Sequence, residues 1–277
     1  MVKFNNPTFQ PTQHILAWLV LFIIASINFG CSSTSIFLKQ AEQFSFATEI
    51  VQGCDFQHAV MRKPGKGNTL HVYIEGDGSP WIMERWIATD PTPVKMIMPT
   101  LMALDPAPAL FLGRPCYFQT DDTQCNERWW TSARYGEKIT ESLNCALNGS
   151  MEQFESVWLI GHSGGGALAM LMAAQRDDVK KIITLAGNLD IEAWTKAHKY
   201  SPLSESHNPA NLAALPSDIE QLHFIAAQDD RITANMIKAT IKKQPGSRLI
   251  VMDDLDHSCC WEQVWTDILK SINGTQP

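Results

Sequence analysis

Short apolar runs recur along the chain, and polar or glycine-rich residues follow each of them. Runs of this kind predict strands at residues 70–75, 109–113, 157–160, 181–186, 222–227 and 247–252. Apolar residues at helical spacing predict helices over 92–105, 133–147, 233–243 and 261–272. Two short alternations between residues 46 and 62 predict an opening hairpin. Because strands and helices alternate, we expect an α/β fold with a doubly wound, mostly parallel sheet.

One segment, residues 188–216, breaks this alternation. It is rich in Pro, Asn, Ser and His and has no regular apolar period. Insertions at this point of such a sheet often cover the functional site, so we expect a small cap or lid here. The remainder of 46–277 is long enough to bury one core, and we expect it to form a single domain.

The N-terminus has the features of a targeting segment. Lys3 precedes an apolar run from residue 15 to 29, and Gly30-Cys31 follows that run. A small residue and then Cys after such a run resembles a bacterial lipoprotein signal. We therefore expect a leader at 1–30, lipidation of Cys31 and a tether at 31–45. Export to the cell envelope with a lipid anchor is the expectation; secretion without lipid and an uncleaved anchor are the alternatives.

Cysteine content agrees with export. The seven cysteines are Cys31, Cys54, Cys116, Cys125, Cys145, Cys259 and Cys260. If Cys31 carries lipid, six remain, and an even number in an exported protein favours disulfides. Cys116 and Cys125 flank a short polar loop, and we expect them to pair. A bridge between Cys259 and Cys260 is a further option.

Charge limits the classes of partner. The formal net charge is −7, and removal of the leader, whose single charge is Lys3, leaves −7 − 1 = −8. An acidic body disfavours nucleic acid and anionic membrane surfaces, and the sequence has no basic cluster. We expect no nucleic-acid partner.

The pentapeptide Gly161–Gly165 has the pattern G-x-S-x-G, with Ser163 at its centre. An apolar run precedes it and a helix-like run of small residues follows it, which is the context of a nucleophile elbow. Glycines on both sides let strand and helix approach without a Cβ clash. Ser163 is therefore the candidate nucleophile. A glycine-rich turn that only packs a helix on a strand is the alternative.

A nucleophilic serine requires a base, and the base requires an orienting acid. Asp229 and Asp230 follow the strand at 222–227, where parallel sheets place functional groups. Asp229 is preferred because Ile232 then falls three residues later, as it often does in the fold that this chain resembles. Asp230 is the alternative acid, and Asp190 is a weaker one. His257, in the loop after the last strand, is the candidate base.

Tetrahedral intermediates of acyl transfer also require backbone donors for the developing oxyanion. The N–H of Gly164, directly after the serine, is the first candidate. The strand at 70–75 runs into a glycine-rich turn, and the Asp77 N–H there is our candidate for the second donor, followed by that of Gly76.

Together these features resemble the α/β-hydrolase superfamily over residues 46–272. The resemblance rests on the elbow Gly161–Gly165, the Asp229 turn, the His257 loop and the glycine turn at Gly76. It implies the α/β-hydrolase fold with a triad in the order Ser163, Asp229, His257. Many members have His where this chain has Glu75, which adds negative charge near the oxyanion site. Segments such as 74–81 also resemble uncharacterised exported bacterial members, which carry no transferable substrate.

We therefore expect an exported serine hydrolase that cleaves a carboxylic ester of a small-molecule acyl substrate through an acyl-enzyme. A peptidase or thioesterase with the same triad is the close alternative, and a catalytically silent, envelope-tethered binding protein is the alternative from another class. His257, Cys259 and Cys260 lack the paired spacing of metal ligands, so we expect no metal and no cofactor. The membrane is an expected partner through the N-terminal lipid, and the oligomeric state is left open.

Overall fold

The computed structural model describes residues 33–118, 120 and 122–272. The leader at 1–30 and Cys31 lie outside this range. Among the described residues, none of the helices combines the length and the apolar character needed to cross a bilayer.

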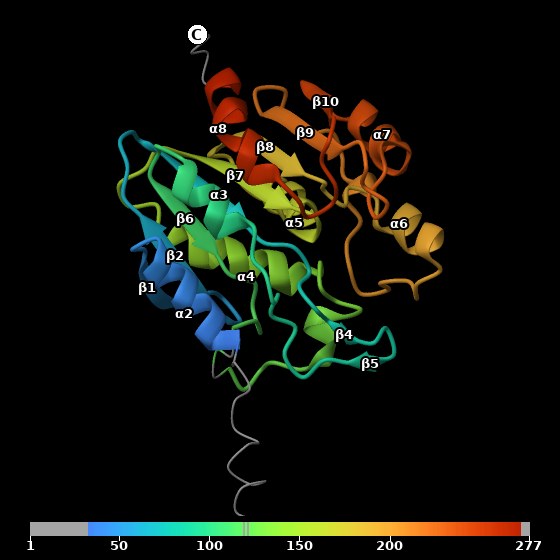
Figure 1. Ribbon diagram of the computed structural model, residues 1–277, viewed down its shortest axis with the longest axis horizontal. Helices are drawn as coiled ribbons and strands as arrows, with labels where there is room; N and C mark the ends of the chain where they lie inside the picture. The colour runs from blue at the N-terminus through green and yellow to red at the C-terminus, as the bar shows by residue number, and fades with distance from the viewer. Residues whose placement is uncertain (1–32, 119, 121, 273–277) are drawn as a thin grey trace, which may run out of the picture.

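An eight-stranded sheet forms the centre of the molecule (Figure 1). Its strands, in spatial order, are β1 (Ala47–Gln52), β2 (Gln57–Lys63), β6 (Ala109–Leu112), β3 (Thr69–Ile74), β7 (Ser156–His162), β8 (Val179–Leu185), β9 (Glu220–Ala226) and β10 (Ser247–Met252). β1 and β2 pair antiparallel, as do β2 and β6, and all other pairs are parallel. The expectation of a mostly parallel sheet is confirmed.

Helices cover both faces of this sheet. They are α2 (Ser33–Gln43), α3 (Met98–Leu104), α4 (Glu137–Asn148), α5 (Gly164–Ala173), α6 (Ile191–His198), α7 (Ala234–Lys243) and α8 (Trp261–Ile272), with short 3-10 turns at Glu127–Trp130 and Pro209–Asn211. α3 packs with α8, and α4 packs with α5. Because the central strands are covered on both sides, β3, β8 and β9 are buried almost throughout, which explains their continuous apolar runs.

The chain segment expected to be a tether, residues 31–45, is instead largely the helix α2. Phe37 and Ala41 lie four residues apart on this helix and are both buried, and the Phe37 ring lies 5.1 Å from that of Phe118. An apolar pair at this spacing is enough to attach a short helix to the core.

Two helices are shorter than expected. The pattern over 92–105 yields only α3, because Pro99 is accommodated in the first turn of a helix and not within it. α4 begins at Glu137 and not at 133, after Gly136.

A small ribbon outside the main sheet was not expected. β4 (Trp81–Ile82) and β5 (Trp86–Ile87) form a two-stranded antiparallel hairpin. Two residues per strand are too few to produce an alternating pattern. Residues 188–216, expected as a cap, contain α6 and the turn Pro209–Asn211.

Three disulfides link the described cysteines. Cys116–Cys125 is the pair expected from the polar loop, and the vicinal bridge Cys259–Cys260 is also present. Cys54–Cys145, which was not assigned, connects the loop between β1 and β2 to α4.

Candidate functional site

Ser163 occupies a sharp turn between β7 and α5. Its backbone has φ 52° and ψ −119°, a conformation that L-residues rarely adopt. A Cβ on Gly161 would lie 2.2 Å from the carbonyl oxygen of Gly165, and one on Gly165 would lie 2.1 Å from that of Ile74. Both positions therefore require glycine, and the strained turn presents the serine side chain at the carboxyl edge of the sheet.

Three side chains from loops at this edge form a hydrogen-bonded chain. The His257 Nε2 atom lies 3.0 Å from Ser163 Oγ, and its Nδ1 atom lies 2.8 Å from Asp229 Oδ2. The other Asp229 oxygen accepts hydrogen bonds from the backbone N–H groups of Arg231 and Ile232, at 2.8 and 2.9 Å. Each carboxylate oxygen thus has a defined partner, and the carboxylate is held in one orientation.

The structure also places the two other acids considered above. Asp230 is exposed and lies outside this chain of contacts. Asp190 caps α6, accepting from the Ala193 N–H at 3.1 Å and from the Asn208 side chain at 3.0 Å. Asp229 is therefore the carboxylate that contacts His257.

The electrostatics of His257 favour a neutral imidazole. Burial lowers its pKa, and the hydrogen bond to Asp229 opposes this only in part, so the net shift is downward. With Asp229 accepting from Nδ1–H, the Nε2 lone pair faces the Ser163 hydroxyl. This is the arrangement in which an imidazole can take a proton from a serine.

The glycine turn after β3 lies against Ser163. A Cβ on Gly76 would lie 3.3 Å from the Ser163 Cβ. The Gly76 N–H donates to the Glu75 side chain at 3.1 Å, so it is already occupied. Gly164 is the first residue of α5, where N–H groups have no intrahelical acceptor. The N–H groups of Gly164 and Asp77 therefore remain as the candidate oxyanion donors, because that of Gly76 is engaged by Glu75.

A buried cluster that the sequence did not reveal fixes Asp77. Its carboxylate accepts from Arg114 at 2.6 Å, from Arg134 at 3.1 Å and from the Tyr135 hydroxyl at 2.5 Å. Its carbonyl accepts from the Tyr117 hydroxyl at 2.9 Å. Burial alone raises the pKa of Asp77, but the two guanidinium groups outweigh burial and lower it. The cluster carries one carboxylate and two guanidinium groups, so its net charge beside Ser163 is positive.

Glu75, which stands where many α/β-hydrolases have His, has a structural role. One carboxylate oxygen accepts from the backbone N–H groups of Ile97 and Met98 at the start of α3, at 2.8 and 3.0 Å. The other lies 3.7 Å from His162 Nδ1, and His162 Nε2 lies 2.8 Å from the His257 carbonyl. The added carboxylate is thus hydrogen-bonded and buried, and it braces the glycine turn.

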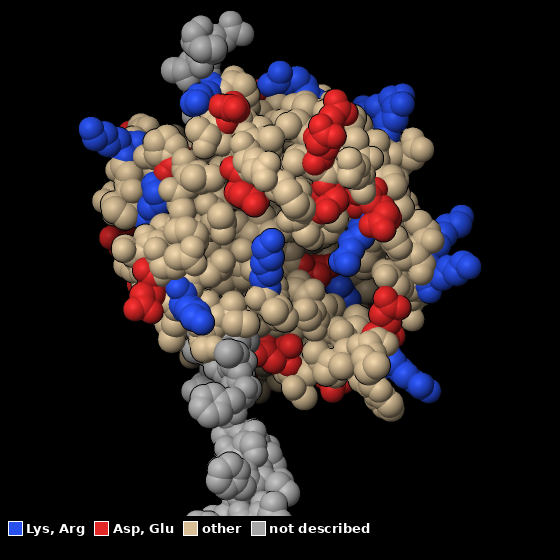
Figure 2. Space-filling view, viewed as in Figure 1, with Lys and Arg blue, Asp and Glu red and all other residues tan. Residues whose placement is uncertain are grey.

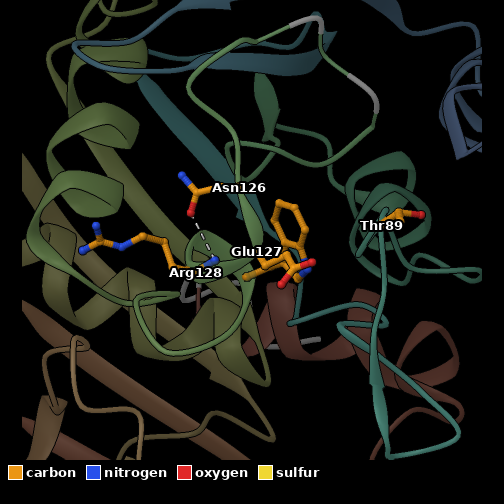
Figure 3. A pocket seen from close by; sticks show the side chains of 5 residues that line it. Thr89, Asn126, Glu127 and Arg128 are labelled. Carbon is orange, nitrogen blue, oxygen red and sulfur yellow. Dashed lines mark hydrogen bonds between the residues drawn. The ribbon is translucent and has the colours of Figure 1, made fainter.

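A cavity of about 900 Å³ opens above these groups. Its lining includes Ser163, His257, Asp77, Trp81 and Trp194. Residues 188–203 of the expected cap contribute Asn188, Lys199, Tyr200, Ser201, Pro202 and Leu203 to the same lining. A second hollow, of about 540 Å³, lies between Thr89 and the turn at 126–130 (Figure 3). There the Asn126 side chain accepts from the Arg128 N–H, and the lining includes neither a histidine nor a cysteine.

Comparison with known proteins identifies the fold. No protein-family model and no curated protein sequence matches the chain. Among solved structures, an esterase from Pyrococcus furiosus aligns with a TM-score of 0.59 and 13% identity, over 84% of this chain and 90% of the esterase.

Two further solved structures give the same result. An alpha-beta serine hydrolase homologue from Coxiella burnetii aligns with a TM-score of 0.56 and 14% identity, over 82% of this chain and 95% of that one. A membrane phospholipase A, described as a bacterial virulence factor, aligns with a TM-score of 0.58 and 11% identity, over 95% and 98%. At such identities the agreement concerns the fold. The chain has the α/β-hydrolase fold.

Proposed function

We propose that the protein is a serine hydrolase that cleaves carboxylic esters through an acyl-enzyme. The observation that carries the proposal is the hydrogen-bonded chain from Ser163 through His257 to Asp229, with the serine in a strained turn. Packing alone does not require this geometry. A nucleophile, a base and an orienting acid in contact at the floor of a cavity match the requirements of nucleophilic acyl transfer.

In the proposed reaction, Ser163 Oγ attacks the ester carbonyl carbon while His257 Nε2 takes the hydroxyl proton. The negative charge of Asp229 stabilises the imidazolium that forms. When the tetrahedral intermediate collapses, the C–O bond to the alcohol breaks and His257 returns its proton to the leaving alkoxide. Water then attacks the acyl-serine by the same route, releasing the acid and restoring the serine.

The intermediate's oxyanion would accept hydrogen bonds from the N–H groups of Gly164 and Asp77. Removing one such donor typically lowers turnover by ~10²–10³. The buried cluster of Asp77, Arg114 and Arg134 supports this role. Its ion pairs hold the glycine turn in place, and its two guanidinium groups outnumber its one carboxylate. Ester specificity is supported by the activities that two structurally similar proteins are named for, an esterase and a phospholipase A.

Covalent labelling with a fluorophosphonate probe tests the proposal. The probe reacts with serines activated by a base, so the wild-type protein is expected to label and Ser163→Ala is not. Ser258→Ala is the matched control, since Ser258 lines the same cavity without contacting the His257 ring. Absence of labelling in folded wild-type protein would favour the binding-protein alternative, and equal labelling of Ser163→Ala would show that the reactive residue is not Ser163.

The pH dependence of kcat/KM is a second test. Only neutral His257 accepts the serine proton, so activity should fall as pH decreases through its pKa. Because burial lowers that pKa, we expect the half-maximal point below about pH 6.5, the ordinary value for histidine. A half-maximal point clearly above this value would contradict the assignment of His257 as the base.

Folding stability must be followed over the same pH range as a control. Burial lowers the pKa of His58 to about 4 and that of His223 to about 3. Below about pH 6.5 the unfolded chain binds protons at these positions and the folded chain does not, so acid destabilises the fold. The pH dependence of kcat/KM is therefore interpreted only at pH values at which circular dichroism shows native protein.

A further inference from the structure

Exposed apolar side chains gather around the mouth of the catalytic cavity. The described residues include ten large hydrophobic residues that are exposed, and six of these lie on or beside the mouth: Trp81, Ile82, Met83, Trp86, Val94 and Tyr200. Met83 and Trp86, on the β4–β5 hairpin, are 88% and 64% exposed. A soluble monomer scatters such residues singly, so a cluster of this kind marks an interaction surface.

The hairpin is held firmly at its base. The Ala88 N–H donates to the Pro80 carbonyl at 2.9 Å, and the Ser79 N–H donates to the Pro91 carbonyl at 2.7 Å. The Trp130 indole donates to the Ala88 carbonyl at 3.0 Å. The base is therefore fixed to the body, while the apolar tip projects without a core behind it. Such a tip is suited to insertion into an apolar phase.

The lining of the same mouth has mixed charge, with basic groups in slight excess. Its acidic residues are Glu75, Asp77 and Glu84, and its basic residues are Lys95, Arg134, Lys199 and Arg231. Lys95, Lys199 and Arg231 take part in no salt bridge within the described chain. The Arg85 guanidinium lies over the Trp86 ring, 5.8 Å from its centroid. Figure 2 shows both signs of charge around a hollow on the face between the positions of α6 and the hairpin in Figure 1. Unpaired cations beside exposed aromatics complement a phosphate group attached to an apolar chain.

We propose that the β4–β5 hairpin docks on a phospholipid surface and that the cavity beside it takes a phosphate-bearing acyl ester from that surface. The proposal rests on the proposed ester hydrolysis. Trp81 connects the two parts, since it belongs to the hairpin and also lines the cavity. The net charge of −7 disfavours a strongly anionic surface, so the apolar tip supplies the attachment and a zwitterionic lipid is the matching partner.

The direction of the hairpin agrees with this proposal. In Figure 1, β4 and β5 lie toward the lower end of the molecule, as does the start of α2 at Ser33. The expected lipidation site, Cys31, precedes Ser33 by two residues in the sequence. An anchored chain would thus bring the hairpin close to the bilayer that holds its N-terminus.

Docking is tested separately from catalysis. Two full-length proteins, both with Cys31→Ser, each carry a fluorophore on one introduced cysteine. The first is labelled through Met83→Cys at the tip of the hairpin. The second is labelled through Ile50→Cys, at an exposed apolar position on the edge strand β1. In vesicles of phosphatidylcholine with brominated acyl chains, fluorescence at position 83 should fall about two- to threefold and that at position 50 should not change, because only an inserted tip contacts the bromine atoms. Equal quenching at both positions, or none, would overturn docking.

Substrate choice is tested by kinetics. Met83→Ser combined with Trp86→Ser should lower hydrolysis of phosphatidylcholine vesicles by about tenfold or more, with hydrolysis of a soluble butyrate ester changed less than about twofold. Ile50→Ser combined with Val251→Ser is the matched control and should leave both rates unchanged. If wild-type protein cleaves the soluble ester but not the vesicles, or if both double variants behave alike, this inference fails and ester hydrolysis stands. If wild-type protein hydrolyses neither substrate and does not react with the fluorophosphonate, the proposed ester hydrolysis itself is contradicted. In that case the quenching at position 83 still shows whether the hairpin docks.

Discussion

Replacing Ser163 with alanine is expected to lower kcat on a soluble butyrate ester by ~10⁴–10⁶, because the acyl-enzyme can no longer form. Any residual rate would come from substrate positioning and the backbone donors at Gly164 and Asp77. The strained turn tolerates alanine no worse than serine, since both carry a Cβ, so the fold should be unchanged. Steady-state kinetics with thermal unfolding of the same sample measures both.

The matched variant for this experiment is Ser258→Ala. Ser258 lines the same cavity but makes no hydrogen bond to the His257 ring, and its side chain is exposed. We expect its kcat to stay within about twofold of wild type, because the hydrogen-bonded chain from Ser163 through His257 to Asp229 does not include Ser258. If the Ser163→Ala protein retained a tenth of wild-type kcat, Ser163 would not be the nucleophile.

Asp229→Asn is expected to lower kcat by ~10³–10⁴. The substitution removes the charge that stabilises the imidazolium, and an amide NH₂ facing Nδ1 favours the tautomer whose Nε2 carries the proton and cannot accept another. The second oxygen can still accept from the Arg231 and Ile232 N–H groups, so the loop should keep its shape. The measurement is kcat on the soluble ester, with KM determined in the same titration.

Asp230→Asn separates the role of the carboxylate from a general effect of charge. The substitution changes charge by the same amount one residue away, but Asp230 is exposed and outside the chain of contacts. Its kcat should stay within about twofold of wild type. If Asp229→Asn and Asp230→Asn lowered kcat to a similar extent, Asp229 would act only through its negative charge and not through its contact with His257.

Local signals in the sequence were enough to predict the sheet and the loops that carry Ser163, Asp229 and His257. Buried parallel strands such as β8 and β9 produce continuous apolar runs. The expected strand at 247–252 and helix at 261–272 coincide with β10 and α8. The elbow is likewise a local feature, since glycine is required within five residues of one turn. Chain order then brings three loops to the same edge of the sheet.

Long-range contacts were not accessible from such signals. Asp77 is bonded by Arg114, Arg134 and Tyr135, which lie 37, 57 and 58 residues away in the sequence. Nothing in the spacing of two arginines indicates that both are buried on one carboxylate, because pairing of this kind depends on how loops from different strands meet. The hairpin at 81–87 was missed for a different reason: its strands are too short to show a period.

The disulfide between Cys54 and Cys145 makes the stability of the protein depend on where in the cell it folds. The bridge joins residues 91 positions apart, and the loop it closes contains β2, β3 and β6 together with the turn at Glu75 to Asp77. Closing a loop of this length removes unfolded-chain entropy equivalent to about 4–5 kcal/mol. Because small domains are stable by only about 5–15 kcal/mol, a chain held reduced in the cytosol would lose a large share of its stability. In an oxidising compartment the bridge would instead hold this loop closed, and with it the glycine turn that lies beside Ser163.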